Sequence, residues 1–428
     1  MQIGIIGAGV AGLTAAWLLD HDHAVTLFEK QSRLGGHSDT IQVEREGETI
    51  GIEAGFEFFS ESMYPNFYRL LTLLHVPVHK FPLTATFYRT DPCAITMLPP
   101  YRNGRVIWPA CRPRALAEMV QLARVLRLAT PLMNAADTSI TLSQFLDGIA
   151  LSAAVKERFI YPFLLAGWCV ELEEFKQFIA YDVLRYPFLH QPAGLKLAQW
   201  LEVAGGTQAY VNSMARELSG TRSMTAAGIA GITRANGGLA VRMADGSTHQ
   251  FDQLIVATNA SEARELLAQL DGAEVAREIL SAFEYFPTTI AVHGDRRLMP
   301  ANEQHWSVAN VRYDGRHSQN TIWKGWKSKR PVFKSWVTYD TRMPEPLYAS
   351  VNYQHPKVNA QYFRAQPRLA ALQGNEGLWF AGMYTCGVDS HESAILSSMA
   401  VAQKLAPRSA RLKQLAGAMV DANGPRPV

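Results

Sequence analysis

The sequence of 428 residues is poor in cysteine, and its four cysteines are widely separated. They are Cys93, Cys111, Cys169 and Cys386, and no two of them form a CxxC pair. Structural zinc sites and redox dithiols both need closely spaced thiols, so we expect neither, and no bound metal. Scattered unpaired cysteines are usual in a reducing compartment and favour the cytoplasm. Cys386 is interpreted as a small buried apolar residue.

Two further absences limit the class of protein. No run of about 18 apolar residues occurs, so we expect no membrane-spanning helix. The first expected strand begins at residue 2, which leaves no room for a signal peptide before it. The net charge of +3 is close to balance and gives no reason to expect a nucleic-acid partner. With 48% hydrophobic residues the chain can bury a large core, and we expect two interleaved domains.

The most informative pattern that is present is a complete βαβ unit at the start of the chain. An apolar run at 2–6 leads into a glycine-rich turn at 7–12, and a helix is expected over 13–19. A second apolar strand at 24–28 ends directly before Glu29. Strand, glycines, helix, second strand and acid in this order predict a dinucleotide-binding site.

Each part of this unit has a physical role. Gly7 permits the tight turn, Gly9 allows the backbone to approach a pyrophosphate, and Gly12 allows the helix to pack closely on the sheet. The helix N-terminus, with free N–H groups and a positive dipole end, favours phosphates. Glu29 is placed to accept hydrogen bonds from a ribose diol.

Two other segments narrow the nucleotide to FAD. Arg33 is followed by the Gly35–Gly36 pair, as in the FAD-binding members of this fold. Near the other end of the chain, 377–382 is expected to be a buried strand ending in glycine, and 390–405 a helix with one apolar face. Such a helix can direct its N-terminus at the pyrimidine end of a flavin, where negative charge develops on reduction.

On these motifs the chain resembles the FAD-dependent amine-oxidase and phytoene-desaturase superfamily of flavoproteins. Within it, the chain looks most like the bacterial proteins described only as predicted NAD/FAD-binding oxidoreductases. The resemblance extends over nearly the whole chain. The further stretches that carry it are Gly55–Phe56, 64–67, 141–146, 205–211, 337–340, 355–356, 366–374 and 380–382.

The resemblance implies an α/β fold in which a Rossmann-type, glutathione-reductase-like FAD-binding domain is interleaved with an α+β substrate domain of mixed sheet and helices. The expected segments are 1–75, 205–275 and 371–407 for the FAD-binding domain, 76–204 (helical) and 276–370 (antiparallel sheet) for the substrate domain, and 408–428 for a partly mobile C-terminal tail. Helical periodicity in the sequence predicts helices over 142–149, 152–166, 173–184 and 207–218.

The resemblance also implies FAD as the cofactor. Ile229 is expected to meet the adenine, and Ala257 and Thr258 to line the dinucleotide groove. The full set of expected cofactor-binding residues is Gly7, Ala8, Gly9, Val10, Ala11, Gly12, Glu29, Lys30, Arg33, Gly35, Gly36, His37, Ser38, Gly55, Phe56, Ile229, Ala257, Thr258, Gly382, Met383, His391, Glu392 and Ser393.

His391 and Glu392 are the candidate catalytic residues, because the resemblance places them beside the flavin. For Glu392 we favour a structural interpretation, as a helix cap or a partner of a cofactor hydroxyl. Two departures from the bacterial subgroup lie nearby: Glu53 replaces an aspartate, and extra residues precede His391. The substrate or the reaction is therefore expected to differ from that of the subgroup.

Three other features admit a functional and a structural interpretation. Lysines within 323–329 lie roughly where amine oxidases carry a lysine near the flavin, but the spacing matches poorly and a solvated charged run is favoured. Residues 114–133 are expected to form a mostly apolar helix with a narrow polar stripe. Packing in the core is favoured for it; the alternative is a peripheral membrane contact whose arginines meet headgroups or a carboxylate. Aromatic residues of the substrate half, of which a minority is expected to reach the cavity, are Tyr161, Phe163, Trp168, Trp200, Trp306, Trp323, Trp326, Trp336 and Tyr353.

These observations lead to three hypotheses of function. The first is an FAD-dependent oxidoreductase that abstracts a hydride from a hydrophobic small molecule, by dehydrogenation or desaturation of an acyl lipid, isoprenoid or secondary metabolite. The second is a flavin amine or amino-acid oxidase that produces hydrogen peroxide. The third is a flavin-dependent double-bond isomerase without net redox change. Substrate, electron acceptor and oligomeric state stay open at this point.

Overall fold

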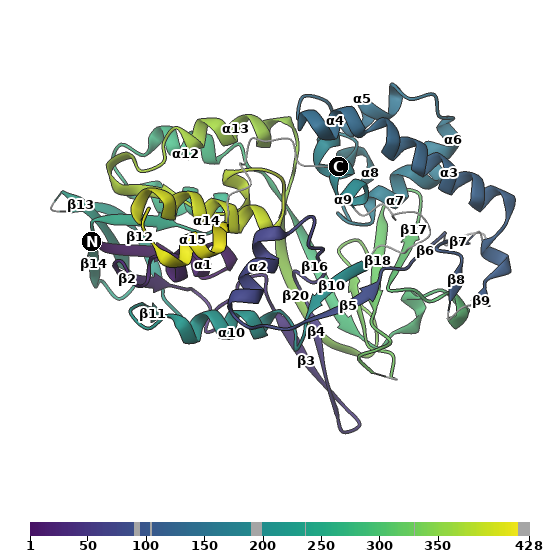
Figure 1. Ribbon diagram of the computed structural model, residues 1–428, viewed down its shortest axis with the longest axis horizontal. Helices are drawn as coiled ribbons and strands as arrows, with labels where there is room; N and C mark the ends of the chain where they lie inside the picture. The colour runs from purple at the N-terminus through teal and green to yellow at the C-terminus, as the bar shows by residue number, and fades with distance from the viewer. Residues whose placement is uncertain (90–94, 103–104, 190–198, 236, 329, 418–428) are drawn as a thin grey trace.

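The computed structural model describes residues 1–89, 95–102, 105–189, 199–235, 237–328 and 330–417. Two parts lie side by side along the long axis of the molecule (Figure 1). The long strands β16 (Tyr285–His293) and β20 (Leu347–Pro356) run between them.

A five-stranded parallel sheet forms the centre of the first part. In spatial order its strands are β11 (Arg222–Met224), β2 (Ala24–Phe28), β1 (Gln2–Ile6), β15 (Gln253–Val256) and β21 (Leu378–Phe380). Every neighbouring pair is parallel, which confirms the predicted α/β class. Helices cover one face of this sheet, and helices with a small antiparallel sheet cover the other. Because both faces are buried, β1 and β15 are mostly apolar.

Helix α1 (Val10–Leu19) is almost wholly buried, because it lies between the sheet and α14 (His391–Leu405). The hydroxyl of Ser398 on α14 donates a hydrogen bond to the carbonyl of Ala11 at 2.7 Å. The helix predicted over 390–405 is confirmed, with Ser390 as its N-cap. The other helices of this part are α2 (Pro65–Leu73), α10 (Thr207–Glu217), α11 (Ala260–Leu266), α12 (Glu274–Leu280), α13 (Ala360–Ala370) and α15 (Ala410–Ala416).

Five of these helices, α2, α11, α12, α13 and α15, were not predicted. α13 begins at Asn359, whose side chain accepts a hydrogen bond from the Tyr362 amide. α15 occupies the start of the segment expected to be a mobile tail, where Arg411 donates a hydrogen bond to the Trp17 carbonyl at 2.9 Å. Residues 418–428 of that expected tail lie outside the described residues.

A seven-stranded sheet forms the second part. In spatial order it contains β20, β16, β19 (Phe333–Trp336), β18 (Ser318–Trp323), β17 (Ala309–Tyr313), β6 (Ala85–Arg89) and β7 (Ile95–Leu98). The strands between 285 and 356 are antiparallel to their neighbours, as predicted. The sheet continues through β6, which pairs with β17 in parallel, so it is mixed.

Helices of different lengths cover this second sheet. They are α3 (Pro113–Leu128), α4 (Thr130–Ala135), α5 (Leu142–Asp147), α6 (Ala153–Val155), α7 (Tyr161–Leu165), α8 (Leu172–Phe175) and α9 (Ala180–Leu189). The helix predicted over 152–166 formed: residues 153–165 are helical throughout, with a π-helical turn over Lys156–Ile160. The helix predicted over 173–184 is broken into α8 and α9, where the Ile179 amide donates to the Val358 carbonyl at 2.9 Å.

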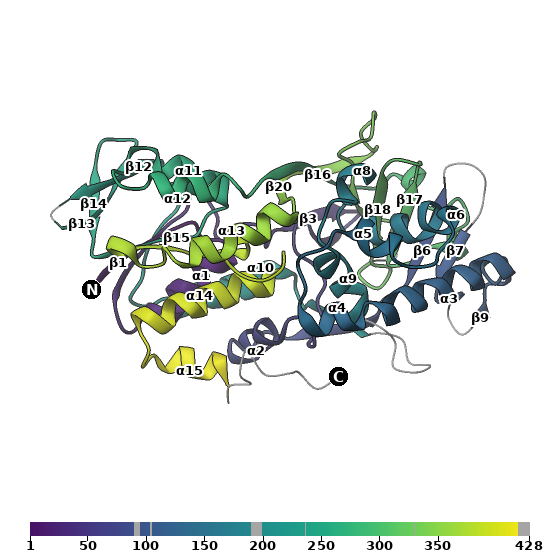
Figure 2. The same ribbon diagram turned by 90° about the horizontal axis from the view of Figure 1, so that it is seen from above.

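Smaller antiparallel units complete the fold. They are β3 (Thr40–Arg45) with β4 (Glu48–Glu53), β5 (Val78–Pro82) with β10 (Gln199–Val203), β8 (Tyr101–Arg102) with β9 (Arg105–Val106), and the three-stranded sheet β12 (Ile229–Ala235), β13 (Gly238–Met243) and β14 (Thr248–Phe251). Seen from above, α3 runs along one edge of the second part, beside β9 (Figure 2). Within the described ranges, none of the helices has the length and apolar character needed to cross a membrane.

Candidate functional site

A cavity of about 720 Å³ opens between the first sheet and strand β20. Its walls come from the carboxyl ends of β1, β2, β15 and β21, from the first residues of α14, and from residues 351–356. The carboxyl edge of a parallel sheet is where α/β folds bind their ligands. The predicted cofactor-binding residues that line this cavity are Gly7, Gly9, Val10, Ala11, Glu29, Lys30, Arg33, Gly35, Gly36, His37, Ser38, Ile229, Ala257, Thr258, Gly382, Met383 and His391.

The glycine-rich turn has the geometry that its sequence predicts. Gly7 has φ of +98°, and a Cβ there would approach the Ala257 carbonyl oxygen to 2.8 Å. A Cβ on Gly12 would lie 1.8 Å from the Gly7 carbonyl oxygen, so α1 can pack on the turn only without a side chain at this position. Gly9 is different, because no atom of the residues that the structure describes lies within 4 Å of the place of its Cβ. Its open side leaves the backbone accessible for a pyrophosphate.

Arg33 offers a free hydrogen-bond donor at the cavity wall. One guanidinium nitrogen, Nη2, donates to the Gly36 carbonyl at 3.1 Å and lies 2.8 Å from the Asp39 carboxylate. The other, Nη1, is buried and has no hydrogen-bond partner in the part of the chain that the structure describes. A buried guanidinium nitrogen without a partner is costly, and a phosphate oxygen would satisfy it.

Glu29 is buried at the end of β2. Its carboxylate accepts hydrogen bonds from the Ala8 amide at 2.8 Å and the Gln31 amide at 2.9 Å. These bonds use two of about four acceptor positions of a carboxylate, so the group can still accept from a ribose diol. Lys30 beside it forms an ion pair with Glu262 from α11.

His391 stands at the N-terminus of α14 and is held from two sides. Its Nε2 is 3.0 Å from the hydroxyl of Tyr210, which in turn is 2.5 Å from the Ser38 hydroxyl. Its ring stacks on Phe56, with 4.1 Å between ring centroids. Burial, with His37 nearby, lowers the pKa of His391 to about 3, so the imidazole is neutral at neutral pH. A neutral ring can orient a ligand by hydrogen bonding, and the start of α14 favours negative charge.

Glu392, the second candidate catalytic residue, points away from the cavity. Its carboxylate accepts hydrogen bonds from the Asn66 amide, the Asn66 side chain and the Phe67 amide, at 3.0, 2.6 and 3.0 Å. These groups lie in the first turn of α2, so Glu392 caps that helix. The other predicted cofactor-binding residues that stand behind the cavity wall are Ala8, Gly12, Gly55, Phe56 and Ser393.

An acid–histidine pair that the sequence did not single out lies in the cavity wall. Nδ1 of His355 is 3.5 Å from the carboxylate of Asp389, and both residues line the cavity. Behind them, the backbone amide of Asp389 donates to the buried carboxylate of Asp182. Burial raises the pKa of Asp389, and burial together with Asp389 raises the pKa of Asp182. The signal was present in the sequence, since Asp389 belongs to the extra residues before His391.

The lysines of 323–329 are not a solvated run, and this expectation is wrong. Lys324 is buried, with its ammonium 2.8, 2.7 and 2.6 Å from carboxylates of Glu53, Glu57 and Glu202. Burial lowers the pKa of Lys324, but the three carboxylates outweigh it and raise the pKa above its ordinary value. Lys327 is also largely buried, at 3.3 Å from Glu53, and neither lysine lines the cavity. Lys329 lies outside the described residues.

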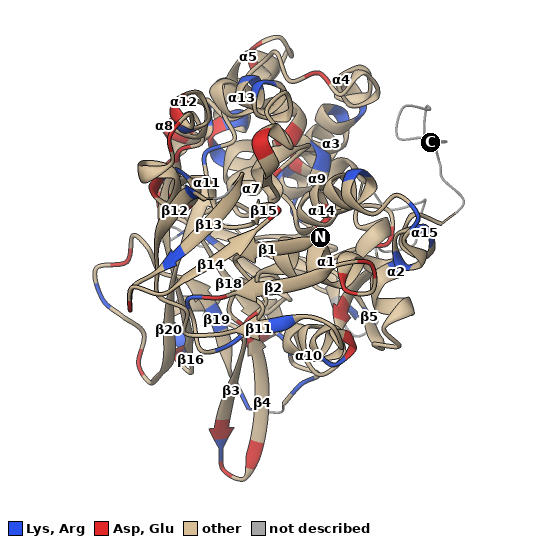
Figure 3. Cartoon of the chain, turned by 90° about the vertical axis from the view of Figure 1, so that its left-hand side faces the viewer, with Lys and Arg blue, Asp and Glu red and all other residues tan. Residues whose placement is uncertain are grey.

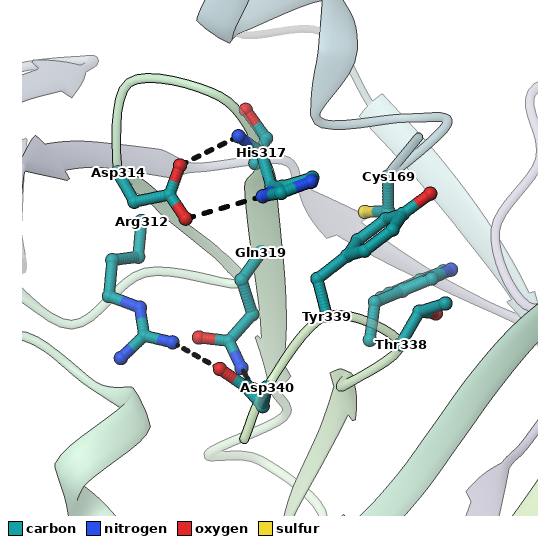
Figure 4. Close-up of a pocket in the computed structure, with 10 residues that line it drawn as sticks. Cys169, Arg312, Asp314, His317, Gln319, Thr338, Tyr339 and Asp340 are labelled. Carbon is teal, nitrogen blue, oxygen red and sulfur yellow. Dashed lines mark hydrogen bonds and ion pairs between the residues drawn. The ribbon is translucent and has the colours of Figure 1, made fainter. Parts of the chain in front are cut away.

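Few of the aromatic residues that the sequence analysis named for the substrate half line the cavity. Of the aromatic residues expected for the substrate half, Tyr353 lines it. Tyr285 and Tyr384 also line it and were not predicted. A second, separate pocket holds about 30 Å³, which is room for about two water molecules (Figure 4). Its charged groups satisfy one another, as in the Arg312–Asp340 pair at 2.7 Å, so it is too small and too fully paired to be the main site.

The fold and the cavity together define a dinucleotide-binding flavoprotein. A glycine turn open at Gly9, an unpaired Arg33 nitrogen and a helix N-terminus at His391 all fit FAD. The comparisons agree: the model of the flavin-containing amine oxidoreductase family matches residues 10–310. The chain belongs to this family, and it is an FAD-dependent oxidoreductase.

Solved structures with the same fold cover nearly the whole chain. The fatty acid isomerase of P. acnes, which produces CLA, is 16% identical with a TM-score of 0.70, over 94% of this chain and 98% of that chain. Cyclohexylamine oxidase from Brevibacterium oxydans IH-35A is 16% identical with a TM-score of 0.63, over 94% and 99%. Wild-type putrescine oxidase bound to putrescine is 14% identical with a TM-score of 0.64, over 95% and 100%.

One curated relative also matches, over a short stretch. It is an L-amino-acid oxidase of Siganus canaliculatus, 57% identical over 47 residues. The match covers 11% of this chain, and the chain spans only 9% of the length of that relative.

Proposed function

We propose that the protein dehydrogenates a largely apolar organic substrate at a carbon–carbon bond. The observation that carries this proposal is the cavity of about 720 Å³, whose lining includes Tyr285, Tyr353 and Tyr384 in addition to the glycine turn. Aromatic walls favour an apolar or conjugated molecule. Bound FAD supplies a two-electron acceptor for the hydride that leaves the substrate carbon.

The chain's own residues then account for the second hydrogen. Removal of a hydride from one carbon leaves a proton to be lost from the neighbouring carbon. The His355–Asp389 pair lines the cavity, and the buried Nδ1 of His355, which has no hydrogen-bond partner among the described residues, is suited to accept that proton with the Asp389 carboxylate 3.5 Å away. His391, neutral and held by Tyr210, orients the ligand from the α14 side. The aromatic walls exclude water from the reacting atoms.

A second candidate function, amine oxidation, is favoured by the same acids. Asp389 in the cavity wall is backed by Asp182, and a substrate ammonium placed against them would lower the raised pKa of Asp389. In that case Asp389 binds the substrate, whereas in the dehydrogenation it helps to move a proton.

The first experiment is an anaerobic titration of the purified FAD-loaded protein, followed by the flavin absorbance. The panel contains amines, amino acids, saturated acyl lipids and polyenes. We expect bleaching by an acyl lipid or polyene. Bleaching by amines alone would contradict the proposal and support amine oxidation, and product formation without lasting bleaching would contradict it in favour of isomerisation.

The variant Asp389→Asn separates the two roles of this acid. If the pair accepts a proton, the rate of flavin reduction falls about 100-fold with KM little changed. If Asp389 binds an ammonium, KM rises and the limiting rate changes less. His355→Gln should reproduce the rate loss in the first case only.

A further inference from the structure

Residues 95–136 carry an unusual concentration of positive charge. The segment has six arginines, no lysine and one acid, Glu118, in a chain whose net charge is only +3. By contrast, Lys, Arg, Asp and Glu are interspersed over the side of the molecule shown in Figure 3. The five arginines used below are Arg105 of β9, Arg112 and Arg114 at the start of α3, and Arg124 and Arg127 near its end.

The one acid of this segment does not offset that charge at the surface. Glu118 is on the buried face of α3, where it accepts a hydrogen bond from the Thr96 hydroxyl at 2.9 Å. Its other oxygen is 3.3 Å from Arg114 and 3.4 Å from Arg158. The arginines that face the solvent therefore meet no exposed acid from residues 95–102 or 105–136.

Large apolar side chains are exposed among these arginines. Trp108, in the short turn before α3, is 77% exposed, and Val120 on α3 is 64% exposed. Leu116, Val120 and Arg127 follow one another at helical spacing on the outer face of α3, opposite the buried Leu122 and Val125. We call Val106, Trp108, Leu116, Val120 and Leu128, with the five arginines, the α3 surface.

A cavity of about 120 Å³ opens beside this surface. Arg112 and Arg114 stand at its wall, and Phe87, Phe159 and Pro162 give it an apolar lining. Arginines next to an apolar recess match the chemistry of a lipid, which joins an anionic headgroup to hydrocarbon.

We propose that the α3 surface binds the face of a bilayer that contains anionic phospholipids. The arginines meet the phosphates, and Trp108, Leu116 and Val120 enter the boundary between headgroups and acyl chains. A second copy of the chain fits poorly, because a twofold contact would bring these arginines against their own equivalents. The proposal does not depend on the flavin chemistry.

Sedimentation of the FAD-loaded protein with vesicles tests this proposal. Vesicles of phosphatidylcholine alone are compared with vesicles that also contain phosphatidylglycerol, at low and high salt. We expect binding to the anionic vesicles, weakened by salt because screening acts on exposed charges. Equal binding to both kinds of vesicle, or binding to neither, would overturn the proposal.

Matched variants locate the contact. Val120→Ser and Val275→Ser each replace an exposed helical valine, on α3 and on the distant α12. Likewise, Arg127→Gln on α3 is paired with Arg264→Gln on α11. We expect the two α3 variants to lower the partition coefficient about fivefold each and the two controls to leave it unchanged.

Two outcomes would assign the surface elsewhere. If the α3 variants and their controls lost vesicle binding equally, the effect would be nonspecific, and this would overturn the proposal. A concentration-dependent dimer that Val120→Ser dissociates, without vesicle binding by the parent protein, would assign the α3 surface to a second copy and also overturn it. Trp108→Ser adds an independent check. In the parent protein, the fluorescence of Trp108 should shift to the blue on vesicle binding, and this shift should be absent from the variant.

Discussion

His391 shows how a single buried residue couples the site to pH. Its pKa falls from an ordinary 6.5 to about 3 because burial, and then the neighbouring His37, disfavour the charged form. Below pH 6.5 the unfolded chain binds a proton that the folded protein does not. The stability contribution of the neutral ring is therefore complete above the unfolded pKa and is lost as the pH falls toward the folded pKa.

The variant His391→Gln should make the free energy of unfolding less sensitive to acid. Between about pH 6.5 and pH 4 we expect the parent protein to lose about 1.4 kcal/mol per pH unit more than the variant. Urea unfolding of both proteins at several pH values measures this difference. The buried acids titrate in both proteins and largely cancel in the comparison, so parallel curves would contradict a buried neutral His391.

Local patterns predicted residues that line the cavity along one stretch of chain, and missed those that depend on distant partners. Gly9, Arg33 and His391 each belong to a motif of a few residues, and all line the cavity. Lys324 was misjudged because its three carboxylates come from residues more than 100 positions away. Asp389 was passed over for a similar reason, since it lies in the turn before α14 and its partner His355 comes from strand β20.

At the scale of elements, the Lys324 cluster joins segments that the chain order keeps apart. Glu53 ends β4, Glu202 lies in β10, and Lys324 follows β18 directly. Lys334 of β19 adds a further contact, 3.1 Å from Glu57. The cluster therefore fixes the β3–β4 hairpin of the first part against the sheet of the second.

Replacing Lys324 by Met should leave buried carboxylates without their main partner. We expect Lys324→Met to lower the free energy of unfolding by about 3–5 kcal/mol, because an uncompensated buried charge is costly. The control is Lys404→Met on α14, where an exposed lysine should matter by less than about 0.5 kcal/mol. Chemical denaturation measures the free energy of unfolding of both variants. Equally small losses in the two variants would mean that the buried carboxylates take up protons at little cost.

Element boundaries were predicted well where one periodicity continues and poorly where tertiary contacts cut across it. The helix over 390–405 has a cap, an apolar face and no interruption, and it formed as predicted. The segment 173–184 is equally apolar, yet its backbone at Ile179 bonds to Val358 and breaks the helix. No local pattern reports a hydrogen bond to a residue 179 positions away.

At the scale of the whole molecule, the cavity draws on three separated segments, 6–38, 227–266 and 382–394, in addition to the second sheet. A ligand that binds only when all of them are assembled stabilises the entire fold by mass action. The α/β class could be predicted because the first motif is local. The mixed second sheet was expected only from the resemblance, because no short pattern encodes the parallel pairing of β6 with β17.

Two glycine variants separate the folding role of the turn from its binding role. Gly12→Ala would place a Cβ 1.8 Å from the Gly7 carbonyl oxygen, so we expect it to destabilise even the FAD-free protein, by about 1–3 kcal/mol. A Cβ on Gly9 would meet no atom of the described residues within 4 Å, and Gly9 has φ of −69°, which valine adopts freely. The FAD-free Gly9→Val protein should therefore be as stable as the parent, within about 0.5 kcal/mol.

Addition of FAD should then distinguish the parent from Gly9→Val. At about 100 times its Kd, FAD stabilises the parent by about 2.7 kcal/mol, which corresponds to a rise of about 3 °C in Tm for a chain of this size. In Gly9→Val the added side chain stands in the cavity where the pyrophosphate must approach, so the rise should disappear. Thermal unfolding with and without FAD measures it. An equal rise in both proteins would place the pyrophosphate away from the glycine turn, and would also contradict the interpretation of Arg33 and the N-terminus of α1 as its partners.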